Sequence, residues 1–519
     1  MAIKPFKNEK YTDFSKADAR RKQILAIENL EAKLGKEYPL IIGGEKIYTE
    51  NKLNSTNPSD PSQIVGVFQK GTTNDAQHAM EVALAKFEDW KLIPAKKRTD
   101  YLFRAAKIMR KRRFELNAIM ILEVGKTWPE ADGDTAEAID FLEFYAREML
   151  RYDGRQPVVQ YKGEKDELVY VPLGVGVVIP PWNFPLAILT GMTCAAVVTG
   201  NTVVLKPSSD SPLIAYKFME VMEEAGLPEG VINFVSGPGS AVGDTLVMHP
   251  KTRFISFTGS KEVGIHIYEE AAKVKPGQIW LKRVVAEMGG KDSIIVDEGV
   301  DLDEVAAGIT VAAYGFQGQK CSACSRAIIH ENVYDKLLQK LVKKANAITV
   351  GAAKEQSNYM GPVINKGSME KMLEYIQIGV KEGGRLVAGG TQASGDGYFL
   401  RPTIIADVDP KATISQEEIF GPVLAVIKAK DFDHALDIAN NTEFGLTGAV
   451  YSKNRKRLEK AKEHFHCGNL YLNRKCTGAL VGVHPFGGFN MSGTDSKAGG
   501  RDYLLLFMQG KSIAEKKSK

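Results

Sequence analysis

The chain has 519 residues, of which 44% are hydrophobic and 25% are charged. This composition is typical of a globular protein of about two to four domains, and it excludes a disordered chain, a collagen and a small disulfide-stabilised scaffold. The formal net charge of +5 is spread over a long chain without a clustered basic surface, so no nucleic-acid partner is expected.

From residue 175 onward, short runs rich in Val and Ile alternate with helical segments. In chain order we expect strand 175–179, helix 185–199, strand 202–205, helix 211–225, strands 231–235 and 254–257, and helix 263–272. A second series contains strands 293–296, 327–329 and 423–427 and helices 333–347, 368–381 and 432–440. Such alternation predicts βαβ units and mostly parallel sheets, the first series having the outline of a nucleotide-binding domain.

Two segments interrupt this alternation. Residues 156–171 alternate polar and apolar side chains, and residues 504–513 are apolar and compatible with a strand. We expect both to be strands that leave the body of the subunit and pair with a neighbour.

The cysteines and the uncharged segment 168–205 indicate in which cellular compartment the protein is expected. Five cysteines, an odd and sparse number, favour a reducing environment over a disulfide framework. Residues 1–21 lack the apolar stretch of a secretory signal. The segment 168–205 is long enough to span a membrane, but it contains four prolines and therefore no spanning helix. A cytoplasmic protein without a membrane contact is expected.

Cys321 is a candidate nucleophile because it follows a glycine-rich segment, residues 315–320, that permits a tight turn and close approach by a ligand. Cys324 follows at CxxC spacing, so a buried structural cysteine and a dithiol redox pair remain alternatives. Half of a zinc site is a third reading, but the chain offers no second ligand pair and no metal is expected.

Other polar residues sit where chemistry is possible. Glu287 ends an apolar run beside two glycines and is either a general base or a surface group. Asn183 lies in a Pro-rich turn and either donates to a developing oxyanion or satisfies the turn. Lys206 follows a strand, where its ammonium can meet a ribose hydroxyl or a phosphate. The glycine-rich turns 237–243 and 257–260 lack the GxGxxG pattern, so each is weak evidence for a dinucleotide.

Seven motifs together resemble the aldehyde dehydrogenase superfamily, in that family's order, from about residue 41 to the carboxyl terminus. They are the segments 180–185, 206–208, 257–260, 287–291, 318–321, 418–423 and 485–488. The interval between Glu287 and Cys321 also matches that family's spacing of base and nucleophile.

The resemblance implies an α/β fold of the aldehyde dehydrogenase type. It implies a Rossmann-type NAD-binding domain of residues 1–153 and 173–286, and an α/β catalytic domain of residues 287–490. Residues 154–172 and 491–519 correspond to a small β oligomerisation flap, so a homo-oligomer, at least a dimer, is expected.

The resemblance also assigns roles. Cys321 would attack the aldehyde, Asn183 and the Cys321 backbone N–H would hold the alkoxide, and Glu287 would activate the water that hydrolyses the thioester. The cofactor-binding residues would be Pro181, Trp182, Lys206, Ser208, Ser209, Gly239, Gly243, Phe257, Thr258, Gly259, Ser260, Glu418 and Phe420. Ser209 stands where NAD-preferring members often carry a Glu, so we expect NAD with appreciable tolerance of NADP.

Residues 474–488 resemble the aldehyde-anchor loop of the glutamate γ-semialdehyde (1-pyrroline-5-carboxylate) dehydrogenases, which act in the second step of proline catabolism. The implied substrate-binding residues are Glu137, Phe184, Ser322, Gly478, Ala479 and Phe486. The Ser322 hydroxyl and the backbone N–H groups at Gly478 and Ala479 would hold the substrate α-carboxylate. Another short ω-oxo acid, such as succinic semialdehyde, and a non-catalytic binding protein on the same fold remain alternatives.

Overall fold

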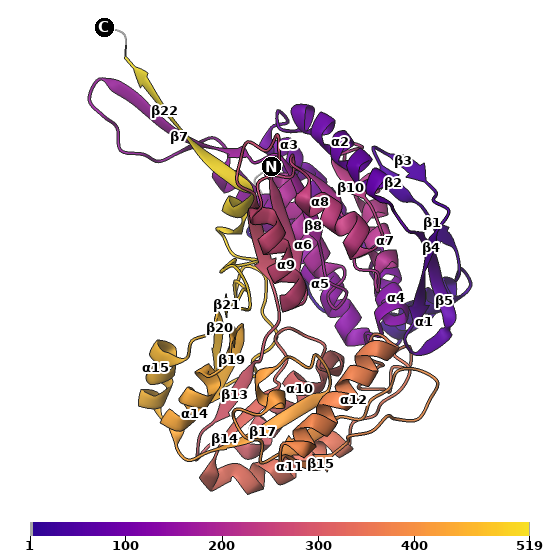
Figure 1. Ribbon diagram of the computed structural model, residues 1–519, viewed down its shortest axis with the longest axis vertical. Coiled ribbons are helices and arrows are strands. Elements are labelled where there is room, and N and C mark those ends of the chain that lie inside the picture. Colours follow the sequence, from indigo (N-terminus) through magenta and orange to yellow (C-terminus); the bar gives the residue numbers. More distant parts are fainter. Residues whose placement is uncertain (1–3, 518–519) are drawn as a thin grey trace.

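The computed structural model describes residues 4–517; residues 1–3 and 518–519, the outer ends of two predicted domains, lie outside the described part. Two lobes, each built on a seven-stranded sheet, lie one above the other in Figure 1, and a narrow β arm projects from the upper lobe and carries the carboxyl terminus.

The sheet of the upper lobe has the strand order β12-β11-β8-β9-β10-β2-β3. Five strands are parallel: β8 (Val175–Ile179), β9 (Thr202–Leu205), β10 (Ile232–Phe234), β11 (Phe254–Thr258) and β12 (Arg283–Glu287). Two antiparallel strands complete it: β2 (Leu40–Ile42) and β3 (Glu45–Ile47). Every residue of β9 is buried, as expected for a parallel strand covered by helices on both faces.

Helices cover both faces of this sheet (Figure 1). They are α2 (Thr73–Trp90), α6 (Ala187–Val198), α7 (Pro212–Glu224), α8 (Asp244–Met248) and α9 (Lys261–Ala272). A further layer contains α1 (Ala17–Glu31), α3 (Ala95–Lys111), α4 (Arg113–Val124) and α5 (Trp128–Tyr152), beside a small sheet of β1 (Glu37–Tyr38), β5 (Asp60–Gln69) and β4 (Lys52–Asn57). Helix α5 packs along α6, which places its carboxylates beside the segment that carries Asn183.

The sheet of the lower lobe has the order β15-β16-β17-β14-β13-β19-β20. Its strands are β13 (Ser293–Val296), β14 (Arg326–His330), β15 (Arg385–Ala388), β16 (Thr403–Ala406), β17 (Val423–Ala429), β19 (Thr447–Tyr451) and β20 (Asn469–Leu472). All neighbours are parallel except β15 and β16. The helices are α10 (Leu302–Tyr314), α11 (Tyr334–Asn346), α12 (Lys366–Lys381), α13 (Thr413–Gln416), α14 (Phe432–Asn440) and α15 (Arg455–His464), and β18 (Phe444–Gly445) pairs with β21 (Phe489–Asn490).

The arm consists of β6 (Arg155–Gln156), β7 (Glu164–Pro172) and β22 (Met508–Lys516). The strand predicted at 504–513 is wrong at its start, because residues Tyr503–Phe507 form a 3₁₀ turn. Leu504 and Phe507 are both buried. Residues three apart share one face of a 3₁₀ turn but lie on opposite faces of a strand, so burying both favours the turn. The strand predicted at 156–171 is likewise interrupted between β6 and β7.

The elements predicted from residue 175 to residue 440 are confirmed, with ends that differ by at most two residues. The segment expected as a glycine-rich turn at 237–243 instead contains a π-helical turn, Gly239–Gly243, that leads into α8. Among the helices of the described residues, none combines the length and the apolar character needed to cross a membrane.

Candidate active site

Two cavities meet at Cys321 and Thr258, which line both of them. The larger has a volume of about 770 Å³ and lies outside the carboxyl ends of β8, β9 and β11, where ligands bind in open α/β sheets. The smaller, of about 290 Å³, lies between α5, the start of α6 and the loop before β21. Cys321 therefore stands where contents of the two cavities can meet.

The loop before Cys321 is held in an unusual conformation. Gln317 has a φ of +56°, in the left-handed region that non-glycine residues rarely adopt. Its buried side-chain amide donates hydrogen bonds to the carbonyl oxygens of Gly125 and Pro362. Gly318 has a φ of +68°. Tertiary contacts thus impose the backbone path that presents Cys321.

The surroundings of Cys321 favour the protonated form of its thiol. Burial raises its pKa well above the ordinary value, and the carboxylates of Asp292, Glu418 and Glu287 add to this effect. Because the thiolate is the nucleophilic form, the thiol must lose its proton before it can attack an aldehyde.

Asn183 is fixed against the same loop. Its side-chain Nδ2 donates to the carbonyl oxygen of Gln319 at 3.1 Å, and its Oδ1 accepts from the backbone N–H of Phe184. Each amide nitrogen carries two hydrogens, so a second N–H is available to an oxyanion. The Phe184 ring lies 3.9 Å from the ammonium of Lys126, which forms a buried ion pair with Asp134 at 2.7 Å. These contacts hold the turn that carries Asn183.

Glu287 ends β12, opposite Thr258 of β11, and lines the smaller cavity. The Ser496 hydroxyl and, at 3.4 Å, the Gly488 backbone N–H donate to its carboxylate. Burial raises the pKa of Glu287 to about 8, while Ser496, Gly488 and the ammonium of Lys497 act in the opposite direction. A carboxylate with this pKa is suited to take up and release protons near neutral pH.

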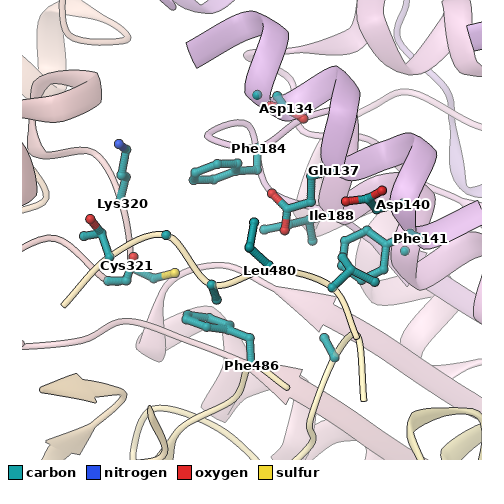
Figure 2. A pocket seen from close by; sticks show the side chains of 18 of the residues that line it. Asp134, Glu137, Asp140, Phe141, Phe184, Ile188, Lys320, Cys321, Leu480 and Phe486 are labelled. Carbon is teal, nitrogen blue, oxygen red and sulfur yellow. The ribbon is translucent and has the colours of Figure 1, made fainter. Parts of the chain in front are cut away.

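The smaller cavity contains all of the predicted substrate-binding residues: Glu137, Phe184, Ser322, Gly478, Ala479 and Phe486. In Figure 2, Cys321 faces the rings of Phe184 and Phe486, while the carboxylates of Glu137 and Asp140 come from the α5 side, opposite Cys321. The cavity therefore has an aromatic middle between a thiol and a pair of carboxyl groups.

The acidic end of this cavity was only partly anticipated. Burial raises the pKa of Glu137 to about 8, and the carboxylate of Asp134 adds to this. Asp140 and Tyr11 also line the cavity and are absent from the predicted set. Asp134, Glu137 and Asp140 recur every three residues within helix α5, and this spacing, which puts them on one face, is the signal that could have found Asp140.

The larger cavity brings together eleven of the predicted cofactor residues: Pro181, Trp182, Lys206, Ser208, Ser209, Phe257, Thr258, Gly259, Ser260, Glu418 and Phe420. Gly239 and Gly243 are not among its lining residues. The segment after β10 turns toward Gly71, whose N–H bonds the Ser236 carbonyl oxygen, and Gly243 lies against the aliphatic stem of Lys206. Since Lys206 itself lines the larger cavity, Gly243 lies one side chain away from that cavity, and the contacts of Gly239 and Gly243 with a cofactor stay predictions.

The lining of the larger cavity fits a dinucleotide. Within the described part of the chain, the buried Lys206 ammonium makes one hydrogen bond, a long one of 3.4 Å to the Pro207 carbonyl oxygen. Glu418 accepts from the Gly290 N–H, and a Cβ on Gly289 would lie 2.2 Å from its Oε2, so only glycine leaves room for it. Ser260 caps helix α9, whose amino terminus can receive a phosphate. A cation, a carboxylate and a helix terminus thus face one polar cavity.

Cys324 lies away from both cavities. It is buried in the core of the lower lobe, and its thiol donates to the Arg326 carbonyl oxygen at 3.5 Å. The thiol of Cys476 contacts it within the same core. This placement favours a structural role for Cys324 over a pair with the cavity-lining Cys321.

Outside these cavities, Asp297, Glu298 and His330 bring three potential metal-ligand atoms close together. The guanidinium of Arg457 lies against both carboxylates, and the Ser452 hydroxyl donates to Asp297. The Arg457 cation already pairs with both carboxylates, so we assign no ligand to this cluster.

Comparisons with known proteins identify relatives over the whole chain. The family model described as "Aldehyde dehydrogenase family" matches residues 47–513. A 1-pyrroline-5-carboxylate dehydrogenase of Geobacillus thermodenitrificans is 58% identical over 514 residues, covering 99% of both chains. The solved 1-pyrroline-5-carboxylate dehydrogenase from Thermus with bound NAD is 51% identical, with a TM-score of 0.98 over 99% of this chain and 100% of the other.

More distant structures have the same fold. The betaine aldehyde dehydrogenase of Staphylococcus aureus in complex with NAD⁺ is 29% identical, with a TM-score of 0.89 over 95% of this chain and 97% of the other. The fold predicted from the motifs is therefore confirmed as that of the aldehyde dehydrogenases. With the family model covering most of its length and relatives above 50% identity, this chain belongs to the aldehyde dehydrogenase family.

Proposed function

We propose that this protein oxidises L-glutamate γ-semialdehyde, the open form of 1-pyrroline-5-carboxylate, to L-glutamate with NAD, as the second step of proline catabolism. The observation that carries the proposal is the smaller cavity, which joins Cys321 to an anchor loop at one wall and buried carboxyl groups at another. The names of its relatives support the same substrate, and the NAD in the Thermus structure supports the cofactor.

The first half of the reaction uses Cys321 and Asn183. The Cys321 thiol gives its proton to water, and its sulfur then bonds to the aldehyde carbon. The aldehyde oxygen becomes an oxyanion that the Asn183 amide and the Cys321 backbone N–H stabilise. NAD, when held by Lys206, Glu418 and the amino terminus of α9, supplies the acceptor for the hydride that the carbon releases. The acyl group then remains on Cys321 as a thioester.

The second half uses Glu287. Its carboxylate takes a proton from a water molecule as the water oxygen bonds to the acyl carbon. The bond between carbon and the Cys321 sulfur breaks, sulfur leaves with the electron pair, and L-glutamate is released. Glu287 lies in the same cavity as Cys321, at its boundary with the larger one near Thr258, which suits a base that acts after oxidation.

An amino-acid substrate carries a negative α-carboxylate and a positive ammonium group, so its site needs partners for both charges. The anchor loop offers the backbone N–H groups at Gly478 and Ala479, and Gly478 has a φ of +84° that favours glycine. The Ser322 hydroxyl adds a donor for the α-carboxylate. Glu137, raised in pKa by burial, becomes an ionised partner when an ammonium enters beside it. Succinic semialdehyde lacks that ammonium and is the second candidate substrate.

Replacing Glu137 with glutamine is expected to lower kcat/KM for glutamate γ-semialdehyde by about 10- to 100-fold, because a charged hydrogen bond is lost. The loss for succinic semialdehyde should be much smaller. Initial rates of NADH formation at 340 nm measure both. Glu130→Gln is a matched control on the same helix, since Glu130 lines the cavity but pairs with Lys320. Equal losses for both aldehydes would remove the amino group from the proposal.

We further propose that NADP is accepted beside NAD. Ser209 lines the larger cavity and its hydroxyl does not repel a 2′-phosphate, while Lys206 and Lys371 contribute positive charge to the same lining. The carboxylate of Asp210 lies in the same lining and repels a 2′-phosphate. Asp210→Asn is therefore expected to raise kcat/KM for NADP relative to NAD several-fold. Paired titrations of the two cofactors test this, and a strong preference of the wild type for NAD would contradict the proposed tolerance.

The protein is proposed to assemble into a homo-oligomer, at least a dimer. Strand β22 pairs with β7 over its whole length, yet beyond Met508 its residues are exposed, and such isolated β ribbons are marginally stable in water. Apolar side chains beside α9 are also exposed: Val274 by 61%, Ile279 by 80% and Leu281 by 77%. Sedimentation at micromolar concentration should give at least twice the chain mass of 56.9 kDa. A species of the single-chain mass would refute the assembly.

A cytoplasmic location is the remaining proposal. All five cysteines are unpaired, which is typical of proteins in reducing compartments. Cell fractionation should recover the enzyme with cytoplasmic markers, and recovery with secreted proteins would contradict this.

A further inference from the structure

The carboxylate of Glu287 is enclosed by the segment 486–498, more than 190 residues away in sequence. Phe486 and Ala498 exchange backbone hydrogen bonds of 2.9 and 2.8 Å, which closes this segment into a loop. Ser496 is buried within the loop, and its hydroxyl donates to Oε1 of Glu287. The closed loop therefore brings this buried hydroxyl to the Glu287 carboxylate.

Two glycines of the loop leave space for the carboxylate. A Cβ on Gly487 would lie 2.8 Å from Oε1 of Glu287, and a Cβ on Gly493 would lie 3.2 Å from Oε2. The Gly488 N–H donates to Oε2 at 3.4 Å. Because the loop backbone approaches both carboxylate oxygens, it forms a binding site that fits one orientation of the Glu287 carboxylate.

Lys497 adds a positive charge near the Glu287 carboxylate. Its ammonium donates to the carbonyl oxygens of Gly468, at 2.8 Å, and Gly487. No ion pair within 4.0 Å joins it to Glu287 in the described residues. The carbonyl groups thus hold the ammonium at a fixed place, from which its field favours the charged form of the Glu287 carboxylate.

Other ionisable groups also face Glu287. The charge of Asp495, on the same loop, raises the pKa of Glu287 and so favours its neutral form. The charge of Glu287 raises the pKa of the Cys321 thiol, which lines the same cavity. The Glu287 charge also raises the pKa of the Tyr503 phenol, which belongs to the 3₁₀ turn. Of the groups around this carboxylate, Ser496, the Gly488 N–H and Lys497 are those that stabilise its negative charge.

We propose that Ser496 and Lys497 are positioning residues for hydrolysis, Ser496 by orienting the Glu287 carboxylate and Lys497 by favouring its ionised, basic form. The inference rests on the proposed function, because it requires that Glu287 takes the proton of the water that attacks the Cys321 thioester. The water oxygen then forms the new bond to carbon, sulfur leaves with the electron pair of the broken bond, and Glu287 returns its proton to solvent.

Ser496→Ala tests the proposal with p-nitrophenyl acetate, an activated ester that acylates a thiol without NAD or an aldehyde. The nitrophenolate burst reports acylation of Cys321, and the steady state reports hydrolysis. We expect the burst to be unchanged. The acid limb, the low-pH side of the profile on which the steady-state rate falls, should move to higher pH by about one unit. The steady-state rate at pH 7 should therefore be roughly tenfold lower. Lys497→Met should move the limb in the same direction, and Lys497→Arg should restore it.

Thr494→Val is the matched control, since Thr494 lies on the same loop and its hydroxyl bonds the backbone of Ala286 but not the carboxylate. An unmoved acid limb in Ser496→Ala, or an equal shift in Thr494→Val, would overturn the proposal. Loss of ester turnover in Cys321→Ala places the ester reaction at this site. If the wild type fails to oxidise glutamate γ-semialdehyde while the ester results hold, only the proposed substrate is rejected.

Discussion

Replacing Cys321 with alanine is expected to abolish aldehyde oxidation, with kcat lowered by at least about 10⁴-fold, because removal of a covalent nucleophile leaves only binding and oxyanion stabilisation. Alanine fits the site without strain, since the unusual backbone precedes it at Gln317 and Gly318. NADH formation with glutamate γ-semialdehyde measures the loss. Fluorescence titration with NADH should show unchanged cofactor binding, which separates lost chemistry from lost folding.

Cys324→Ser is the control for this prediction. Cys324 is buried, and serine can donate the same hydrogen bond to the Arg326 carbonyl oxygen. We expect activity within a few-fold of the wild type, apart from any stability cost of a buried hydroxyl. A folded Cys324→Ser protein that is as inactive as Cys321→Ala would instead support the dithiol chemistry that the CxxC spacing left open, because that chemistry needs both thiols.

Replacing Glu287 with glutamine is expected to separate the two halves of the reaction. An amide cannot take a proton from water, so kcat should fall by about 10²- to 10⁴-fold. Oxidation precedes the need for this base, so rapid mixing should still give a burst of about one NADH per active site before turnover nearly stops. Absence of the burst would show that Glu287 is needed before the thioester forms.

The pH dependence of the wild type follows from the same carboxylate. Only ionised Glu287 is a base, and its pKa is raised to about 8, so deacylation should increase with pH through neutrality and level off above about 8. Glu287→Gln should lose this limb. Steady-state rates at saturating substrate and cofactor check the sign, because a rate that falls as pH rises from 6 to 8 would contradict a carboxylate base.

Local sequence patterns were sufficient for the regular core of the protein. The buried strand at 202–205 and the helix at 432–440 follow from apolar runs and helical periodicity, which short-range geometry fixes. Cys321 could be singled out because the glycines before it permit a tight turn, and Asn183 because the prolines around it restrict the backbone. The order of seven motifs then predicted a family that the comparisons confirm.

Tertiary structure decided what depends on residues far apart in the chain. Ser496 reaches Glu287 across 209 positions, and Tyr11 joins Glu137 at the acidic end of the aldehyde cavity. The family resemblance predicted cofactor contacts at Gly239 and Gly243, and the structure adds that they begin and end a π-helical turn before α8. A residue's type and its neighbours in sequence set which backbone shapes are accessible, whereas burial and the pKa of a carboxyl group depend on which distant surfaces close over it. The amino-acid sequence by itself therefore determined the fold, the candidate nucleophile and the candidate base, and only the tertiary structure decided how that base is held and which acidic groups line the proposed aldehyde cavity.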